Sequence, residues 1–229
     1  MGPVDEPVSL KTSSRARLTD HTREAFGGET LFDALGRVLC DFGRLPRKEL
    51  FESWAVAKRV RRRFAGRPVV EPCAGHGLLA HILLLLDPSS PGAVCVDRRR
   101  PANALALHEA LAARWPRLGE QVRWVEADLD AVDLPGSALV VSVHACGLLT
   151  DRVLDRAIAA RAAVAVLPCC HSLKKCDTGG LQGWLPGPVA IDATRAARLR
   201  AAGYAVHTQT IPEAITPQNR LLMGMPEDA

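Results

Sequence analysis

The sequence EPCAGHG, residues 71–77, joins a short apolar run to a leucine-rich one. The run before it, 68–71, has the length of a buried strand, and the run after it, 78–86, has the length of a short helix. Small residues in such a turn let the backbone approach a ligand closely, and the start of the helix presents unpaired N–H groups. We therefore expect a ligand-binding turn between a strand and a helix.

From Arg67 onward, short apolar runs alternate with helical patterns. This alternation predicts a parallel sheet that helices cover on both faces. The expected strands are 68–71, 93–96, 122–125, 138–143 and 162–167, and the expected helices are 78–86, 102–114, 148–160 and 190–202.

The last two apolar runs, 204–211 and 220–225, follow each other with no room for a helix between them. Gly203 is a natural stop for the helix before them. Two strands joined by 212–217 predict an antiparallel hairpin. The expected fold class is therefore α/β and Rossmann-like, with a mainly parallel seven-stranded sheet, a C-terminal antiparallel hairpin and helices before it.

The N-terminal third lies outside this alternation. Residues 1–28 are polar and end in two glycines, so we expect a flexible arm. Thr30 is a candidate cap for a helix that runs to residue 42, and a second helix is expected over 47–64. The predicted division is an arm over 1–28, a helical segment over 29–66 and a ligand-binding domain over 67–229.

The second of these helices ends in a basic run. Cations in a last turn suit the helix dipole, which makes a solvated face the first interpretation. A contact with phosphate is the alternative. The residues are Lys58, Arg59, Arg61, Arg62 and Arg63.

Length, charge and cysteine content limit the classes of protein to which the chain can belong. A chain of 229 residues with a formal charge of +4 forms one domain, and the charge permits an anionic partner without requiring one. The first 25 residues contain no apolar signal-peptide core, and the longest apolar stretch is too short to cross a bilayer. The seven cysteines are odd in number. We therefore expect a cytoplasmic protein without a disulfide framework.

Two carboxylates are placed after expected strands, where they could hydrogen-bond to an adenosine. Asp97 closes the second expected strand, twenty positions past Gly77, and a carboxylate there can accept both ribose hydroxyls. Asp128 follows the third strand, within reach of an adenine amine. Glu71 precedes the glycines and suits a cationic amino-acid ligand better than a pyrophosphate.

The glycine pattern itself has two interpretations. Gly75-x-Gly77-x-x-Ala80 matches the dinucleotide fingerprint, which keeps a dinucleotide-dependent oxidoreductase as an alternative. The terminal hairpin favours a methyltransferase, because a dinucleotide-binding sheet normally continues as parallel units.

Residues 71–80 with 94–97 resemble the first two motifs of class I S-adenosylmethionine-dependent methyltransferases, and Cys73 stands where many members carry the first glycine. The resemblance covers about Arg67 to the C-terminus. It implies S-adenosylmethionine as the cofactor. The cofactor contacts expected here are Glu71, Cys73, Ala74, Gly75, Gly77, Asp97, Asp128 and His144.

Two clusters end the fourth and fifth strands, namely HACG at 144–147 and PCCH at 168–171. Because the carboxyl ends of neighbouring parallel strands share one edge, the clusters should meet beside the transferred methyl group. A histidine can act as general base. The expected catalytic residues are His144, Cys146, Cys169, Cys170 and His171.

Other roles stay open for these residues. Together with Cys176 they supply soft ligands for zinc or iron, and a metal site at Cys146, Cys169, Cys170 and His171 is the alternative to no metal. Covalent attack by Cys169 on a pyrimidine is a further possibility. The cysteines can also be small buried hydrophobes.

Both clusters, with 45–50 and 52–54, resemble a methyltransferase group marked by H-x-C-G and P-C-C-H. It includes a eukaryotic tRNA 2′-O-methyltransferase and the methyltransferase part of glutathione S-transferase C-terminal-domain-containing proteins. The resemblance implies RNA modification, with a tRNA ribose 2′-hydroxyl as one target. The expected substrate contacts are Arg47, Lys48, Lys174, Lys175 and Asn219.

Two rival functions remain beside an RNA methyltransferase. One is a methyltransferase that acts on a small molecule or a protein with the same fold. The other is a non-catalytic module that binds adenosylmethionine or a metal and senses it.

Overall fold

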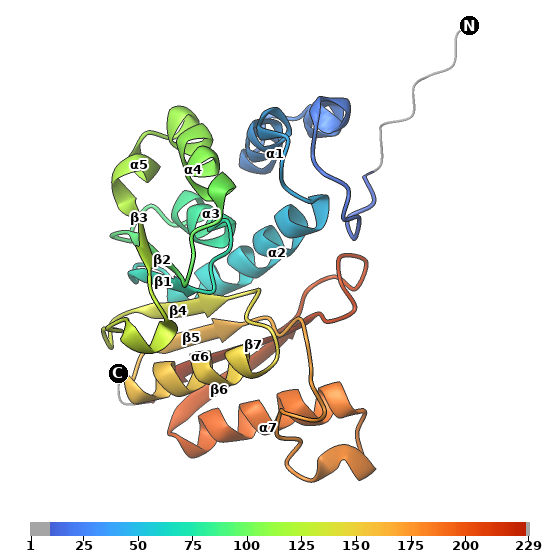
Figure 1. Cartoon of the computed structure of the whole chain (residues 1–229), viewed down its shortest axis with the longest axis vertical. Coiled ribbons are helices and arrows are strands. Elements are labelled where there is room, and N and C mark those ends of the chain that lie inside the picture. The colour runs from blue at the N-terminus through green and yellow to red at the C-terminus, as the bar shows by residue number, and fades with distance from the viewer. Residues whose placement is uncertain (1–9, 228–229) are drawn as a thin grey trace, which may run out of the picture.

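The computed structural model describes residues 10–227, which form one seven-stranded sheet in the order β3-β2-β1-β4-β5-β7-β6 (Figure 1). Strands β1 to β5 pair in parallel, and β7 pairs antiparallel with both β5 and β6. This confirms the expected α/β fold with its C-terminal hairpin. The strands are β1 Val69–Pro72, β2 Ala93–Asp97, β3 Val122–Glu126, β4 Leu139–Ser142, β5 Ala163–Val166, β6 Tyr204–Thr210 and β7 Arg220–Pro226.

Helices cover both faces of the sheet (Figure 1). Helices α1 to α4 share one hydrophobic core with one face, and α6 and α7 share a second core with the other face. The parallel strands are buried on both faces, which is why their sequences read as continuous apolar runs. The helices are α1 Leu31–Phe42, α2 Arg47–Phe64, α3 Leu78–Leu86, α4 Ala102–Arg114, α5 Arg117–Gln121, α6 Leu148–Ala159 and α7 Gly187–Ala201.

The strand order reverses at β1, which pairs with β2 on one side and β4 on the other. Ligands of open α/β sheets bind beyond the carboxyl ends of the strands at such a reversal. The turns after β1, β2, β3 and β4 therefore define the part of the molecule where a ligand site is expected.

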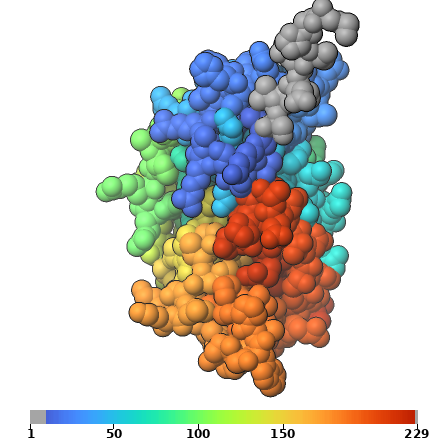
Figure 2. Space-filling view, turned by 90° about the vertical axis from the view of Figure 1, so that its right-hand side faces the viewer, coloured from blue at the N-terminus to red at the C-terminus, as the bar shows by residue number. Residues whose placement is uncertain are grey.

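The N-terminal segment packs on this same end of the molecule. Leu18 and Phe26 are fully buried, and a short 3-10 helix covers Asp20–Phe26. The hydroxyl of Thr12 donates to the carbonyl of Ala214 at 2.8 Å, so the segment touches the loop of the β6–β7 hairpin (Figure 2). The described part of the predicted arm, 10–28, is thus packed against the rest of the molecule through Leu18 and Phe26. Residues 1–9 lie outside the described residues, and the division into three segments stays a prediction.

The ends of several helices are explained by capping residues and by proline. The hydroxyl of Thr30 accepts from the N–H of Asp33 at 3.1 Å and caps α1 as predicted, and α2 has the expected bounds. Helix α7 begins three residues earlier than expected, with a proline in its first turn, where a missing N–H costs nothing. The five-residue α5 is too short to show a helical period. Over residues 10–227, no helix has the length and apolarity that a bilayer crossing needs.

Candidate functional site

The turn between β1 and α3 is held in a conformation that favours glycine. Gly75 and Gly77 have φ values of +54° and +73°, in the left-handed region. A Cβ on Gly77 would lie 2.9 Å from the sulfur of Cys95 and from the ring of Trp124, so the second and third strands press directly on this turn. A Cβ on Gly75 would meet nothing within 4 Å.

A cavity of about 290 Å³ opens beside Gly75, at the reversal of strand order. Its volume is at the lower end of the range for small-ligand sites. Its walls combine apolar side chains with carboxylates and a histidine, which is the composition of a site for an amphipathic ligand. The lining residues are Cys73, Gly75, Val96, Asp97, Arg98, Ala127, Asp128, Leu129, His144, Leu149 and Arg152.

Asp97 and Asp128 reach this cavity from the ends of β2 and β3. The N–H of Gly75 donates to Asp97 Oδ2 at 3.2 Å, which ties the turn to the second strand. Asp128 accepts from the N–H of Asp130 at 3.1 Å and from Arg152 at 2.5 Å. These two contacts, the backbone one first, hold the pKa of Asp128 below its usual value. The carboxylate of Asp128 is therefore ionised at neutral pH.

Glu71 lies behind the turn and is absent from the cavity walls. Its side chain is buried, and its Oε2 accepts from the N–H of Ala80 at 2.9 Å, in the first turn of α3. Burial raises the pKa of Glu71 to about 8, and the nearby carboxylates of Glu49 and Asp97 add to that rise. At neutral pH Glu71 is therefore mainly a neutral acid, and it stabilises the turn by its hydrogen bond with the N–H of Ala80.

Helix α2 also contacts the turn. His76 Nδ1 lies 3.2 Å from Glu49 Oε1, and this hydrogen bond raises the pKa of His76. The start of α2 is thereby fixed beside the glycines. This pairing sets the position of the His76 side chain.

The two predicted bases have different surroundings. His144 is half-buried and lines the cavity. The side chain of His171 is only 3% exposed, and its Nε2 lies 2.8 Å from Asp192 Oδ1. A general base needs a free nitrogen within reach of its substrate. His144 meets that condition better.

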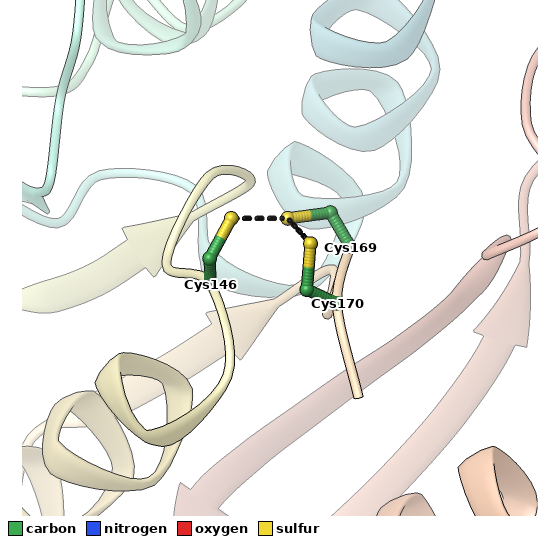
Figure 3. A group of neighbouring side chains, drawn as sticks. All are labelled: Cys146, Cys169 and Cys170. Atoms are coloured by element: carbon green, nitrogen blue, oxygen red, sulfur yellow. Dashed lines mark hydrogen bonds between the residues drawn. The ribbon is translucent and has the colours of Figure 1, made fainter. Parts of the chain in front are cut away.

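The three cysteines of the two clusters converge as expected. The sulfurs of Cys146 and Cys169 are 3.1 Å apart, and those of Cys169 and Cys170 are 3.8 Å apart (Figure 3). Of the four residues in the alternative metal set, Cys146, Cys169 and Cys170 form one group, whereas His171 bonds to Asp192. Burial raises the pKa of both Cys146 and Cys169, and the two groups influence each other.

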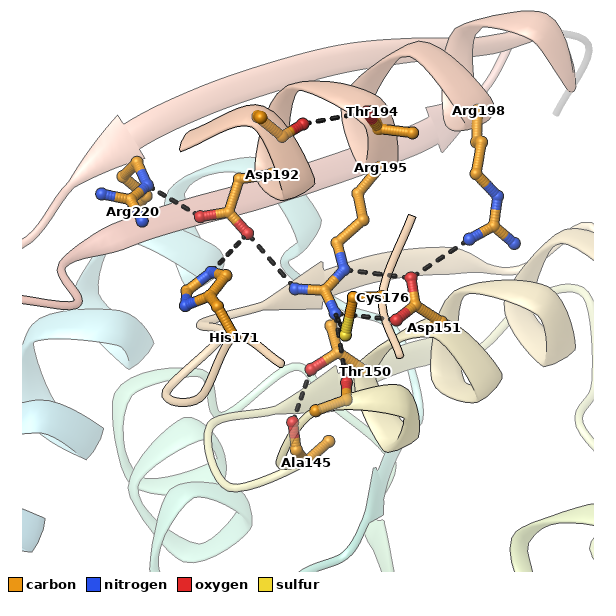
Figure 4. Close-up of polar contacts among 12 residues, drawn as sticks. Ala145, Thr150, Asp151, His171, Cys176, Asp192, Thr194, Arg195, Arg198 and Arg220 are labelled. Carbon is orange, nitrogen blue, oxygen red and sulfur yellow. Dashed lines mark hydrogen bonds and ion pairs between the residues drawn. The ribbon is translucent and has the colours of Figure 1, made fainter. Parts of the chain in front are cut away.

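A buried ion network lies under these loops (Figure 4). The guanidinium of Arg195 is 1% exposed and bonds to Asp151 at 2.8 Å, to Asp192 at 3.2 Å and to the carbonyl of Gly147 at 3.1 Å. Asp192 also accepts from Arg220 at 2.7 Å. Hydrogen bonds from His171 and Arg220 keep the pKa of Asp192 low although burial opposes this.

A larger hollow of about 500 Å³ lies between α7 and the β6–β7 hairpin. Its walls are mainly apolar, and its two charged residues, Asp192 and Arg220, are bonded to each other. No residue of the glycine turn lines it. The cavity beside Gly75 is therefore the better candidate for a cofactor.

Comparison with known proteins agrees with this geometry. Residues 50–176, more than half of the chain, match a protein family described as a methyltransferase domain. The chain belongs to this methyltransferase family. The matched range begins in α2 and contains the glycine turn, the cavity and the three cysteines.

Individual relatives share parts of the methyltransferase. A glutathione S-transferase C-terminal domain-containing protein from Xenopus laevis is 35% identical over 108 residues, which is 46% of this chain and 16% of that protein. An O-methyltransferase family protein from Burkholderia thailandensis has a TM-score of 0.51 and 16% identity, covering 78% of this chain and 59% of that one. A putative O-methyltransferase from Nostoc punctiforme has a TM-score of 0.50, 17% identity and coverages of 79% and 60%. The chain thus spans a minor part of the curated relative, and the two structures share the fold.

The predicted substrate contacts of the methyltransferase have mixed surroundings. Lys48 pairs with the buried Glu52 at 3.2 Å, and the amide of Asn219 donates to the carbonyl of Ile211 at 3.0 Å. The buried Nε–H of Arg47 donates no hydrogen bond within residues 10–227. Lys174 and Lys175 are exposed on the loop after the cysteine pair.

Sequence reasoning missed the Arg195 network and the partner of Asp128. Arg152 and Arg195 belong to α6 and α7, where their spacing resembles that of ordinary surface charges. Arg152 meets Asp128 and Asp130 after β3, and Arg195 meets Asp151 on α6 and the carbonyl of Gly147 after β4. Only tertiary packing gives the two arginines these partners. No local signal in the sequence marks these residues.

Proposed function

We propose that this methyltransferase takes S-adenosylmethionine as its methyl donor and RNA as its acceptor. The cavity that joins Gly75, Asp97, Asp128 and His144 is the observation that carries the proposal. It brings the glycine turn, two carboxylates and a candidate base to the reversal of strand order.

The cavity residues fit this cofactor. The open space beside Gly75 leaves room for a ligand at the turn. Within residues 10–227, of the two carboxylate oxygens of Asp97 only Oδ2 accepts a hydrogen bond, which leaves Oδ1 available to ribose hydroxyls. Val96, Leu129 and Leu149 supply apolar walls for an adenine ring. Glu71, Cys73, Ala74 and Gly77 then shape the turn, with Glu71 acting through the N–H of Ala80.

The bound cofactor supplies an electrophilic methyl group. The chain must supply a path for the proton that a hydroxyl or amine acceptor loses on methylation. His144 lines the cavity and offers an imidazole nitrogen as the acceptor of such a proton. His171, fixed by Asp192, positions the loop that carries Cys169 and Cys170.

A basic hollow supports RNA as the acceptor. Lys58, Arg59 and Arg62 on α2 and Gln209 on β6 surround a space of about 220 Å³. Within residues 10–227 these three cations form no ion pair, and Arg59 Nη1 donates only to its own helix at Ala55. Burial, with a contribution from Arg62, lowers the pKa of Arg59. Unpaired cations held together favour an anionic partner, and RNA phosphates are such a partner.

The proposed acceptor atom within RNA rests on the resemblance of this chain to a group of methyltransferases. The match to the Xenopus laevis protein supports the H-x-C-G and P-C-C-H group, which also includes a tRNA 2′-O-methyltransferase. A ribose 2′-hydroxyl is therefore our proposed acceptor atom. Arg47, Lys48, Lys174 and Lys175 are proposed phosphate contacts around it, and Asn219 shapes the hairpin loop nearby.

A labelled-cofactor assay tests the acceptor class. The full chain is incubated with radiolabelled S-adenosylmethionine and separate RNA, protein and metabolite fractions of cells. We expect label in RNA, released by nuclease, and alkali-resistant dinucleotides if the target is a ribose hydroxyl. Label found only in protein or metabolites would overturn the RNA proposal. His144→Ala should bind the cofactor but transfer roughly 10²- to 10⁴-fold more slowly.

The basic hollow has its own test. Each phosphate contact with a single strand adds about 0.7 to the slope of log affinity against log salt. The double variant R59A/R62A loses two such contacts, so the magnitude of its slope for bound RNA should be smaller by roughly 1.4. Arg200→Ala, an exposed arginine of α7, is the matched control and should leave the slope unchanged. Equal slopes for all three proteins would remove the hollow from the RNA site.

A further inference from the structure

Three cysteine sulfurs meet at the carboxyl end of the sheet. Cys146 follows β4, and Cys169 and Cys170 follow β5 (Figure 3). All three sulfurs lie within 4.8 Å of one another. Within residues 10–227, the recorded side-chain partners of these sulfurs are one another.

The sheet brings the two cysteine loops together. Strands β4 and β5 pair in parallel up to Ser142 and Val166. The N–H of Leu167 donates to the carbonyl of Ser142 at 3.0 Å and extends the pairing to the last residue before the loops. The loops therefore leave the sheet side by side, two to four residues before the cysteines.

Both loops are also fixed from below (Figure 4). The hydroxyl of Thr150 donates to the carbonyl of Ala145, and Arg195 donates to the carbonyl of Gly147 at 3.1 Å, so the residues on either side of Cys146 are anchored. His171, next to Cys170, bonds to Asp192 at 2.8 Å. Side chains held in this way converge without having to be ordered by a ligand.

The spacing of the sulfurs is that of a metal site. In a tetrahedral zinc site with Zn–S bonds of about 2.3 Å, neighbouring sulfurs lie roughly 3.8 Å apart. The separation of Cys169 and Cys170, 3.8 Å, equals this value, that of Cys146 and Cys169 is 3.1 Å, and all three sulfurs lie within 4.8 Å of one another. Small rotations of the side chains therefore suffice to complete the geometry. A disulfide would use only two of the three sulfurs, at about 2.05 Å, and would leave the third without a role.

We propose that Cys146, Cys169 and Cys170 form a thiolate site for a soft divalent cation, zinc foremost, with a fourth position left to solvent or substrate. Three protein ligands and one exchangeable position are the coordination of catalytic rather than structural zinc. Cys146 and Cys170 are exposed, which leaves the fourth position accessible. The proposal stands independently of the acceptor and of the methyl donor.

Metal binding is measured on the full chain, purified and kept reduced under argon. Zinc content is determined by elemental analysis after dialysis, and zinc affinity by competition with a chromogenic chelator. Replacement by Co²⁺ reports the ligands and their geometry, because sulfur-to-cobalt charge transfer requires thiolate ligands and intense d–d bands indicate tetrahedral coordination. We expect one ion per chain and both cobalt signatures.

Cysteine variants locate the site. Cys169→Ser and Cys146→Ser should each weaken zinc binding at least tenfold and remove the charge-transfer band. Cys40→Ser is the matched control, because Cys40 is a buried cysteine elsewhere, 3.3 Å from the hydroxyl of Thr22, and serine keeps that contact. It should retain one ion. Circular dichroism verifies the fold of each variant, and exposed Cys146 is the substitution best tolerated.

Two results would overturn the proposal. One is a reduced, folded protein that takes up no stoichiometric zinc or cobalt. The other is unchanged metal affinity in Cys146→Ser and Cys169→Ser. A Cys146–Cys169 disulfide in air, with no metal bound after reduction, would point to a redox pair instead. Since none of these readouts uses methyl transfer, failure of the metal site and failure of the proposed function are separable.

Discussion

Asp192 and Arg195, one turn apart on α7, join the two loops that carry the candidate catalytic residues (Figure 4). Arg195 holds the carbonyl of Gly147 after β4, and Asp192 holds His171 after β5. Their own contact, 3.2 Å between Nη1 and Oδ1, closes the connection. A helix on one face of the sheet thus fixes the arrangement of side chains at its edge.

Removal of Arg195 should therefore destabilise the protein strongly. Its guanidinium is buried, and Arg195→Met leaves Asp151 and Asp192 without their central partner. Breaking a buried ion pair in this way costs about 3–5 kcal/mol of unfolding free energy. Urea unfolding followed by circular dichroism measures the loss.

Arg198→Met is the matched control for that experiment. Arg198 also pairs with Asp151, at 3.1 Å, but its side chain is 36% exposed. Water screens such a pair, so the expected loss is under about 1 kcal/mol. A loss in Arg195→Met as small as that expected for Arg198→Met would show that the network does not depend on Arg195.

The two glycines of the turn should respond differently to alanine. At Gly77 a Cβ would meet Cys95 and Trp124 at 2.9 Å, so Gly77→Ala combines steric overlap with left-handed strain. Gly75→Ala has only the strain, roughly 1–2 kcal/mol, because nothing lies within 4 Å of its Cβ. We expect Gly77→Ala to lose clearly more stability, while Gly75→Ala reduces cofactor affinity through its position in the cavity. Equal melting temperatures for the two variants would contradict this account.

Glu71 should make stability depend on pH. Burial raises its pKa to about 8 from an ordinary value of 4.5. The folded state then binds the proton more tightly than the unfolded state, so the contribution is complete below about pH 4.5 and is lost as pH rises through about 8. Glu71→Gln keeps an oxygen for the N–H of Ala80 and removes this titration.

The measurement compares unfolding free energies of the two proteins across that pH range. Relative to Glu71→Gln, the unsubstituted protein should lose on the order of 4 kcal/mol between about pH 4.5 and pH 8.5. Parallel profiles for the two proteins would mean that Glu71 is ionised in the folded state at neutral pH.

The sequence predicted the sheet because its signals are local. Apolar runs of strand length, the helix cap at Thr30 and the missing space for a helix before β7 each report on a few neighbouring residues. The meeting of Cys146 with Cys169 and Cys170 was also predictable, since parallel strands end at one edge. These inferences needed only strand order and direction.

Other features depend on packing that no short segment encodes. Both His144 and His171 are candidate bases from the sequence, and what distinguishes them in that role is Asp192, which approaches His171 from α7. Leu18 and Phe26 lie in a polar stretch that reads as a loose arm, yet both are buried. Glu71 similarly reads as a ligand for a cation, but its position behind the turn makes it a buried acid.

Calorimetric titration with S-adenosylmethionine tests the central claim most directly, using the unsubstituted protein and Asp97→Asn. Asparagine can still accept from the N–H of Gly75, 3.2 Å away in the present structure, but it cannot accept two ribose hydroxyls. We predict saturable binding that weakens roughly tenfold in Asp97→Asn, the cost of one hydrogen bond to a charged group, and no binding of NAD. Asp133→Asn, at an exposed position, should match the unsubstituted protein. Binding of NAD alone, or equal affinity in Asp97→Asn, would contradict the account.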